Sequence, residues 1–193
     1  MITQKISFGR AFKLFWRNYV NFTGRSRRSE YWYMIIWHLI FMVPAIVIGV
    51  ISILLIIMGI VTEAEAMTAV GIVLLLLMIG YGLLYGIATF IPNLALQVRR
   101  FHDTDRTMFI PILASALGIT FYIFVNTINL MDPNFENVSS WVLLSFMYIT
   151  IQILAIYQIV ICCFDSVSKN NKYDVYPKDM IKHEASVYHK DDY

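Results

Sequence analysis

Four long stretches of the chain contain no Asp, Glu, Lys or Arg. They are Tyr31–Thr62 (32 residues), Ala66–Val98 (33), Thr107–Met131 (25) and Asn137–Phe164 (28). The helices of a soluble domain of this length need charged faces, and these stretches have none. Of the 193 residues, 59% are apolar and 15% are charged, whereas about 25% are charged in an ordinary soluble domain. This composition excludes a disordered, collagen-like or disulfide-stapled protein and indicates an integral membrane protein.

Each stretch is long enough to cross a bilayer, because about 20 apolar residues rising about 1.5 Å each span about 30 Å of hydrocarbon. We therefore expect an all-α polytopic membrane protein in which four transmembrane helices form two hairpins. The segments expected within the hydrocarbon are 35–58, 69–92, 109–130 and 140–162. We expect a single membrane domain, residues 1–164, followed by a polar cytoplasmic tail, residues 165–193.

The positive charges predict the orientation of the chain. All 15 Lys and Arg residues precede the first span, follow the last span, or lie in the link between the second and third spans. The two other links contain only acids, Glu63 and Glu65 in one and Asp132 and Glu136 in the other. Since cytoplasmic loops carry the excess of Lys and Arg, the positive-inside rule predicts four spans with both termini in the cytoplasm.

Residues 7–19 are expected to form a separate amphipathic helix, because aromatic and basic residues recur on different faces at helical spacing. The aromatic residues are Phe8, Phe12, Phe15, Trp16 and Tyr19, and the basic residues are Arg10, Lys13 and Arg17. Such a helix suits the headgroup layer of a membrane, with its cations toward anionic lipid. The alternative is that the aromatic stripe packs against the protein's own helices.

Two charged clusters, residues 22–32 and 97–106, contain more arginine than topology requires. Their candidate site residues are Arg25, Arg28, Glu30, Arg99, Arg100, His102, Asp103, Asp105 and Arg106. Guanidinium groups bind phosphate or carboxylate well, and a short loop with this mix of charges cannot leave them all unpaired beside lipid. We expect Asp103 and Asp105 to pair with arginines of either cluster, and Glu30 to pair with an arginine of the second cluster.

The sequence contains no complete catalytic or metal-binding pattern. His102 and Asp103 are similar to a ligand pair of metal-dependent phosphohydrolases, but further ligands are missing. Serine nucleophile elbows, glycine-rich phosphate loops and paired zinc ligands are absent. Cys162 and Cys163 are adjacent, so we expect them to pack rather than to form a disulfide bond, with lipidation or redox sensing as alternatives. We therefore expect no enzymatic activity, no cofactor and no metal.

Several polar residues are expected inside the membrane. His38 is a candidate functional residue because it is ionisable, and a hydrogen bond to a neighbouring helix is its alternative role. Asn93, Asn126, Gln152 and Gln158 are expected to form hydrogen bonds between helices rather than to line a solute path. The central hydrocarbon segments contain no carboxylate, which argues against a proton-coupled or cation-coupled transporter.

The two charged clusters resemble the signature blocks of a family of small bacterial inner-membrane proteins, the domain-of-unknown-function family numbered 805. The blocks read Gly24-Arg-Ser-Arg-Arg-Ser-Glu-Tyr-Trp32 and Arg99-Arg-Phe-His-Asp-Thr-Asp-Arg106, and the family has Gly or Asp at the position of Asp105. A closing block is matched by Asp165, Ser166, Asn171, Tyr173 and Pro177, whereas Lys169 and Asp174 replace its glycines. The resemblance implies a multi-span protein of the bacterial cytoplasmic membrane with its motifs on the cytoplasmic side, and it implies no activity. Asp165, Ser166 and Asn171 join His38 as secondary site candidates.

We expect a non-enzymatic membrane protein whose cytoplasmic Arg/Asp/His surface binds anionic lipid headgroups or a protein partner, including a second copy of the chain. Nucleic acid is not an expected partner, because no recognition fold is visible. One alternative is a small channel or transporter with the charged clusters at its inner mouth. The other is a lipid-modifying or envelope-modifying enzyme that uses His102 and Asp103.

Overall fold

The computed structural model describes residues 6–131, 137–167 and 173. Within these residues the chain forms the helices α1 (Phe8–Arg17), α2 (Arg28–Val61), α3 (Glu65–Asp103), α4 (Phe109–Met131) and α5 (Val138–Cys163). Each helix from α2 to α5 is long and apolar enough to cross a membrane. The prediction of an all-α membrane protein with four spans and a separate N-terminal helix is therefore confirmed. Most of the expected tail, residues 165–193, lies outside the described residues.

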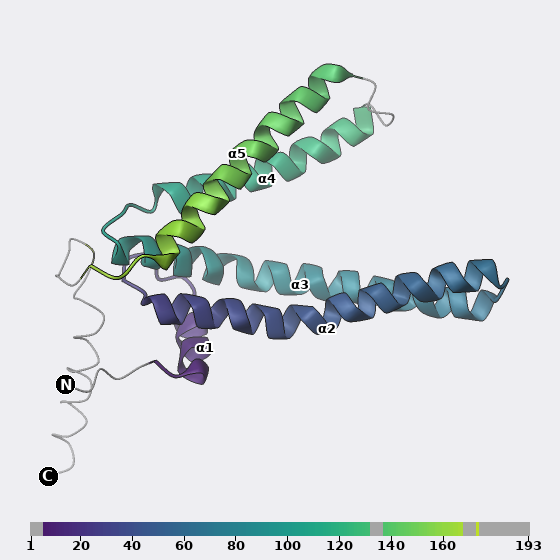
Figure 1. Cartoon of the computed structure of the whole chain (residues 1–193), viewed down its shortest axis with the longest axis horizontal. Helices are drawn as coiled ribbons and strands as arrows, with labels where there is room; N and C mark the ends of the chain where they lie inside the picture. Colours follow the sequence, from purple (N-terminus) through teal and green to yellow (C-terminus); the bar gives the residue numbers. More distant parts are fainter. Residues whose placement is uncertain (1–5, 132–136, 168–172, 174–193) are drawn as a thin grey trace, which may run out of the picture.

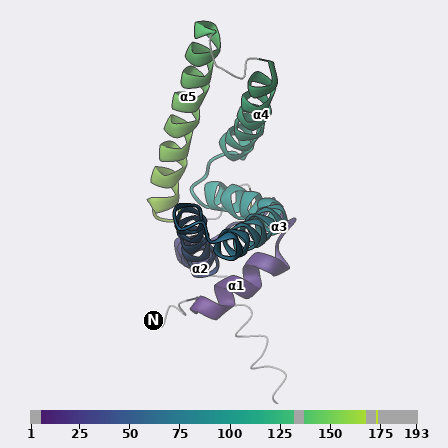
Figure 2. The same ribbon diagram turned by 90° about the vertical axis from the view of Figure 1, so that its right-hand side faces the viewer.

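The four long helices form two hairpins that meet at one end and diverge toward the other (Figures 1 and 2). α2 and α3 lie side by side along their length, and their contact is more extensive than that between α4 and α5. The hairpins meet where α2 begins, α3 ends, α4 begins and α5 ends (Figure 1). We call this the inner end of the molecule, because the two charged clusters lie there.

Glycines bring α2 and α3 close together. A Cβ atom added at Gly71 would lie 2.7 Å from Ile56 Cγ1 and 2.9 Å from the carbonyl oxygen of Ser52. A Cβ atom at Gly59 would lie 2.6 Å from the backbone nitrogen of Thr68. Small residues let helix backbones approach in a bilayer, where helix association depends on van der Waals packing rather than on a hydrophobic driving force. The α2–α3 hairpin therefore depends on the missing side chains at these glycines.

α3 ends in a Schellman motif, in which a residue with left-handed backbone conformation follows the helix. The backbone N–H of Arg106 donates to the carbonyl of Phe101 at 2.9 Å, and Asp105 has a φ of 58°. Glycine adopts this conformation without strain, and Asp is one of the few other residues that adopt it readily. This geometry gives a physical reason for the family's choice of Gly or Asp at this position. Glu63, with a φ of 53°, takes the same place after α2.

α1 runs across the inner part of α2 rather than along it (Figures 1 and 2). Its aromatic stripe packs largely against α2: Phe8 stacks on Trp37 with ring centroids 4.4 Å apart, Phe12 contacts the same indole at 4.8 Å, and Phe15 is fully buried. The alternative that the stripe packs on the protein's own helices therefore holds for these three residues. Trp16 and Tyr19 remain exposed.

The substitution Gly71→Ala is expected to destabilise the protein by about 1–3 kcal/mol, because the added methyl group overlaps the α2 backbone. Gly80→Ala on the same helix is the matched control. A Cβ atom there meets nothing within 4 Å, and Ala favours helix more than Gly does. Thermal unfolding in detergent, followed by circular dichroism, measures both variants. Equal unfolding midpoints would contradict the close helix packing.

Candidate functional site

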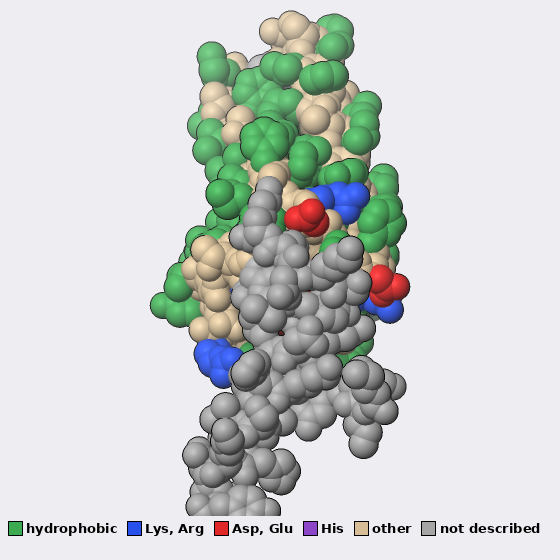
Figure 3. All heavy atoms as spheres, turned by 90° about the vertical axis from the view of Figure 1, so that its left-hand side faces the viewer, with side chains coloured by type: hydrophobic (Ala, Val, Ile, Leu, Met, Phe, Trp, Pro, Cys, Tyr) green, Lys and Arg blue, Asp and Glu red, His purple; other side chains and the backbone are tan. Residues whose placement is uncertain are grey.

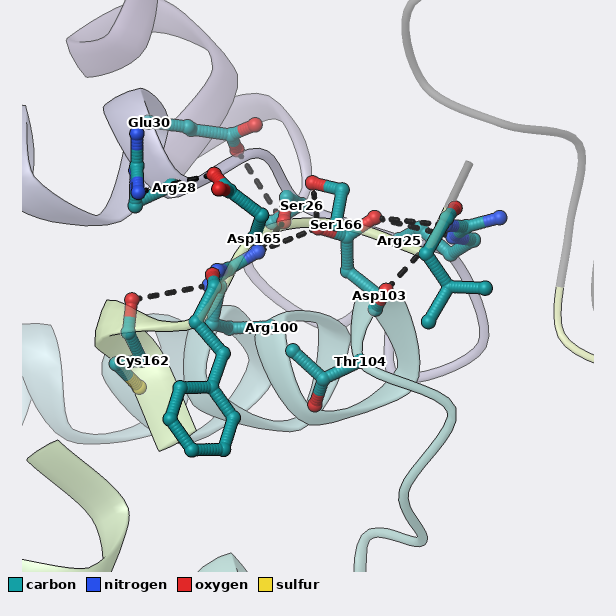
Figure 4. A network of polar contacts seen from close by, with 12 residues as sticks. Arg25, Ser26, Arg28, Glu30, Arg100, Asp103, Thr104, Cys162, Asp165 and Ser166 are labelled. Atoms are coloured by element: carbon teal, nitrogen blue, oxygen red, sulfur yellow. Dashed lines mark hydrogen bonds and ion pairs between the residues drawn. The ribbon is translucent and has the colours of Figure 1, made fainter. Parts of the chain in front are cut away.

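The candidate site lies at the inner end and joins three segments that are distant in the sequence (Figure 4). They are the connection from α1 into the first turn of α2, the last turns of α3, and the segment that follows α5. We call the buried polar contacts between them the clasp. It consists of Arg25, Ser26, Glu30, Arg99, Arg100, Asp103 and Ser166, with the backbone groups that they bind.

Asp103 lies at the centre of the clasp, and its side chain is completely buried. Its Oδ1 accepts a hydrogen bond from Arg25 Nε at 3.1 Å and lies 3.0 Å from Arg25 Nη2. Its Oδ2 accepts hydrogen bonds from Arg100 Nη1 and from Ser166 Oγ. Both arginine side chains are also completely buried. A buried carboxylate is tolerated only when it is paired and hydrogen bonded, and here both of its oxygens are.

Arg100 connects the end of α3 to the end of α5. Its guanidinium donates to the carbonyl of Cys162 at 3.3 Å and to the carbonyl of Phe164. It also donates to the carbonyl of Ser26 at 3.4 Å. The last carbonyls of a helix have no partner within that helix. Arg100 therefore caps the C terminus of α5 while it pairs with Asp103.

Arg99 connects α3 to the segment that precedes α2. Its Nη1 donates to the carbonyls of Asn18 at 2.6 Å and Asn21 at 2.8 Å, and its Nε donates to Ser26 Oγ at 3.0 Å. The backbone N–H of Ser26 in turn donates to the carbonyl of Arg99 at 3.1 Å. Because Asn18 is the C-terminal cap of α1, Arg99 fixes the end of that helix.

Glu30 lies in the first turn of α2 and is buried. Its Oε1 accepts a hydrogen bond from Ser26 Oγ at 3.3 Å and lies 3.8 Å from Arg99 Nη2. The N terminus of a helix carries partial positive charge, which favours a carboxylate there. Glu30 is thus held by the helix, by Ser26 and by the buried arginine.

The segment after α5 is held by backbone contacts as well. Arg25 Nη2 donates to the carbonyl of Val167 at 2.7 Å and to the carbonyl of Asp103 at 3.3 Å. The backbone N–H of Val167 donates to the same Asp103 carbonyl at 3.1 Å. The segment that follows α5 is therefore anchored to the end of α3 by main chain and side chain together.

The predicted site residues Arg28, Asp105 and Arg106 lie outside the clasp. Arg28 forms an exposed ion pair of 2.9 Å with Asp165, and such exposed pairs contribute about 0–1 kcal/mol. Asp105 is exposed. The guanidinium of Arg106 lies over the ring of Phe164, 5.4 Å from its centroid. Of the secondary candidates, Ser166 joins the clasp, Asp165 does not, and Asn171 is outside the described residues.

His102 packs at the edge of the clasp. Its ring stacks on Tyr173 with centroids 3.7 Å apart, and its Nδ1 lies 3.3 Å from the carbonyl oxygen of Gly24. Among the described residues, no group of three or more His, Cys, Asp or Glu side chains is placed to hold a metal ion. His102 and Asp103 contact different groups of the described chain, the carbonyl of Gly24 and the side chain of Arg25 respectively.

His38 lies apart from the clasp, between α2 and α3. Its Nδ1 is 2.6 Å from the hydroxyl of Tyr85, and its Nε2 is 2.8 Å from Oδ1 of Asn93. A neutral imidazole can accept a hydrogen bond at one nitrogen and donate at the other. These contacts match the alternative role of His38, a hydrogen bond to a neighbouring helix.

The structure corrects two expectations about the charged clusters. The second cluster is not a loop, because α3 continues through Arg99, Arg100 and His102 to Asp103 before the Schellman motif ends it. The expected arginine-rich surface is mostly interior, because the flanking segments cover the end of α3. Six of its nine residues are buried, namely Arg25, Glu30, Arg99, Arg100, His102 and Asp103. On the described surface of this end, charged side chains appear in a few separate places (Figure 3).

Sequence reasoning missed several partners within the clasp. Ser26 is not among the candidate site residues read from the sequence, yet it contacts both Arg99 and Glu30. The backbone carbonyls of Asn18, Cys162 and other residues cannot be singled out from the sequence, because every residue has a backbone carbonyl. The two cysteines are free thiols; Cys162 is buried and Cys163 is exposed.

The fold and the clasp define a small polytopic membrane protein with a buried charged network at one end. The chain belongs to the family described as "Protein of unknown function (DUF805)", whose model matches residues 19–175, a range that contains every side chain of the clasp. The resemblance found in the two signature blocks is therefore confirmed.

Two relatives from Escherichia coli (strain K12) are similar to this chain. Inner membrane protein YhaI is 33% identical over 112 residues, which cover 55% of this chain and 76% of that protein. Inner membrane protein YhaH is 35% identical over 94 residues, which cover 47% of this chain and 60% of that protein. No solved structure matches the chain. The relatives agree with the prediction of an integral membrane protein.

The substitution Asp103→Asn is expected to destabilise the protein by about 3–5 kcal/mol, because it removes the carboxylate charge from two buried arginines. Unfolding of the purified protein in detergent measures this loss. Asp105→Asn is the matched control, since Asp105 is exposed and Asn also adopts the left-handed conformation; we expect a change within about 0.5 kcal/mol. Similar stabilities of the two variants would contradict the central role of Asp103.

Proposed function

We propose that this protein is a non-enzymatic inner-membrane protein that binds anionic lipid headgroups at its cytoplasmic face. The observation that carries the proposal is the arrangement of α1, whose aromatic side packs on α2 while its basic side is exposed. In this proposal the arginines of the clasp position α1 and the exposed cations of α1 contact the lipid.

We infer that the inner end faces the cytoplasm. All 15 Lys and Arg residues of the sequence precede α2, begin it (Arg28), follow α5, or lie in the last turns of α3 and the link to α4. Cytoplasmic segments carry such an excess. Both ends of this chain are then cytoplasmic. The anionic lipid of the cytoplasmic leaflet is the nearest source of negative charge for these cations.

The basic side of α1 is built by helical spacing. Arg10, Lys13 and Arg17 recur at intervals of three and four residues, which places them on one face, and all three are exposed. The buried residues Ala11 and Phe15 lie on the opposite side. A helix whose apolar and basic residues occupy opposite sides lies in the membrane interface, with its apolar side inward and its cations at the headgroups.

The depth of α1 suits contact with headgroups. Phe8 and Phe12 contact Trp37 of α2, and Trp37 lies close to residue 35, where the hydrocarbon is expected to begin. The exposed aromatic side chains of Trp16 and Tyr19 are of the type that is enriched at membrane interfaces. α1 crosses α2 at this level (Figure 1), so its axis runs closer to the membrane plane than to its normal.

The buried arginines are less suited to bind the lipid directly. Arg25, Arg99 and Arg100 are buried and already donate to carboxylate, hydroxyl or carbonyl groups of the chain. A headgroup would have to displace these partners from a buried site. The clasp therefore supports lipid binding by holding the end of α1 in place.

The triple variant Arg10→Gln, Lys13→Gln, Arg17→Gln is expected to lose most of the preference for phosphatidylglycerol over phosphatidylcholine. Each cation near an anionic surface contributes about 1 kcal/mol, so the preference should fall by roughly two orders of magnitude. Spin-labelled lipids in vesicles that contain the protein measure the preference. The double variant Arg10→Lys, Arg17→Lys keeps the charge and should keep the preference. A triple variant with unchanged selectivity would overturn the proposal.

A further inference from the structure

Gln152 places a carboxamide near the middle of a membrane span, on a side of α5 that the described residues leave uncovered. The residue is exposed, and it lies at least ten positions from either end of the hydrocarbon segment expected at 140–162. At about 1.5 Å per residue this is about 15 Å from either boundary, too far for a glutamine side chain to reach the headgroups.

Within residues 6–131, 137–167 and 173, the Gln152 side chain has no hydrogen-bonding partner. Other polar side chains of the α4–α5 hairpin have partners. Thr127 and Thr150 donate to the carbonyl four residues earlier, and Gln158 donates to the carbonyl of Ile110 at 3.4 Å. An unsatisfied amide in hydrocarbon costs several kcal/mol, because no water is present to replace the partner. Gln152 therefore needs a hydrogen-bonding partner that the described residues do not provide.

Gln152 lies on the exposed side of α5, away from the side that packs against the rest of the chain. Leu144, Gln158 and Ile161 are buried and mark the side that faces the rest of the chain. With 3.6 residues per turn, Gln152 points about 110° away from the mean direction of all four buried residues of α5, Leu144, Gln158, Ile161 and Cys162. Ile149 and Ile156 flank it on the same face and are 56% and 62% exposed. Because the two hairpins diverge (Figures 1 and 2), α2 and α3 do not cover this face.

We propose that two copies of this chain pair along this face of α5, with Gln152 of each copy hydrogen bonded to Gln152 of the other. A carboxamide both donates and accepts, so two of them satisfy each other. Copies that share one orientation in the membrane are related by a twofold axis along its normal, and such an axis places a residue opposite itself at the same depth. Ser145, two turns away on the same face and also exposed, is small enough to allow close approach.

A lipid does not meet the same requirement. Acyl chains carry no donor or acceptor at this depth, and the headgroups lie about 15 Å away along the helix. A different membrane protein would need its own polar side chain at the same depth, whereas a second copy provides one by symmetry. The pairing face is on α5 and the proposed lipid-binding side is on α1, so either proposal can fail without the other.

The first test measures dimerisation of the full chain in lipid vesicles by single-molecule photobleaching over a range of protein-to-lipid ratios. The wild type is expected to form dimers, and Gln152→Leu is expected to weaken them by roughly threefold to thirtyfold, the range of interhelical hydrogen bonds in membranes. Thr127→Val, which removes an exposed hydroxyl that already binds its own helix, should leave dimerisation unchanged. Circular dichroism and thermal unfolding establish that each variant is folded.

The second test locates the contact by disulfide cross-linking with a membrane-permeable oxidant. Single cysteines are introduced by Ile149→Cys, Ile156→Cys or Phe146→Cys, in a Cys163→Ala background that leaves only the buried Cys162. The first two positions lie on the same face of α5 as Gln152. Phe146 is 69% exposed and lies about 120° around the helix from Gln152. Cross-links at the first two positions but not at the third support the pairing.

Three results would overturn the proposal. They are a wild-type protein that stays monomeric at every ratio, a Gln152→Leu variant that dimerises as strongly as the wild type, and cross-linking that is strongest through Phe146→Cys. Co-purification of a different membrane protein that cross-links to this face in place of a second copy would also overturn it.

Discussion

The fold depends on one buried carboxylate. Asp103 accepts hydrogen bonds from Arg25, Arg100 and Ser166, which come from three segments far apart in the sequence. Removing these charges from water costs several kcal/mol per ion, and the cost is compensated only while every partner is in place. The network therefore favours a single arrangement of the helix ends. Because the two hairpins diverge elsewhere (Figure 1), they are connected by the clasp together with the adjacent apolar cluster of Phe101, Ile161 and Cys162.

The same interactions determine what the inner end presents to its surroundings. Arg99 holds the carbonyls at the end of α1, so that the aromatic side of α1 rests on α2 and its cations remain exposed. The residues of the signature blocks thus act mainly on the architecture. In the function that we propose, residues outside these blocks, such as Lys13 and Arg17, contact the lipid. This division explains why so many arginines occur together while charged side chains appear only in a few separate places on the described surface (Figure 3).

The membrane spans could be predicted from the sequence, because the length of an apolar stretch does not depend on how the chain folds. The partners within the clasp could not, because they depend on how three helix ends approach in space. The 97–106 cluster reads as a loop, and only the left-handed backbone at Asp105 shows where α3 ends. Backbone acceptors such as the Cys162 carbonyl carry no sequence signal. Likewise, the exposure of Gln152 depends on which face of α5 packs inward.

Hydrogen–deuterium exchange of the protein in lipid bilayers tests the clasp most directly, at the backbone amides of Ser26 and Val167. Both residues lie outside the helices, and their N–H groups donate to the carbonyls of Arg99 and Asp103, each at 3.1 Å. If the clasp holds the hairpins together, both amides should exchange as slowly as those in the last turns of α3. Exchange at the rate of an unstructured segment would contradict the account.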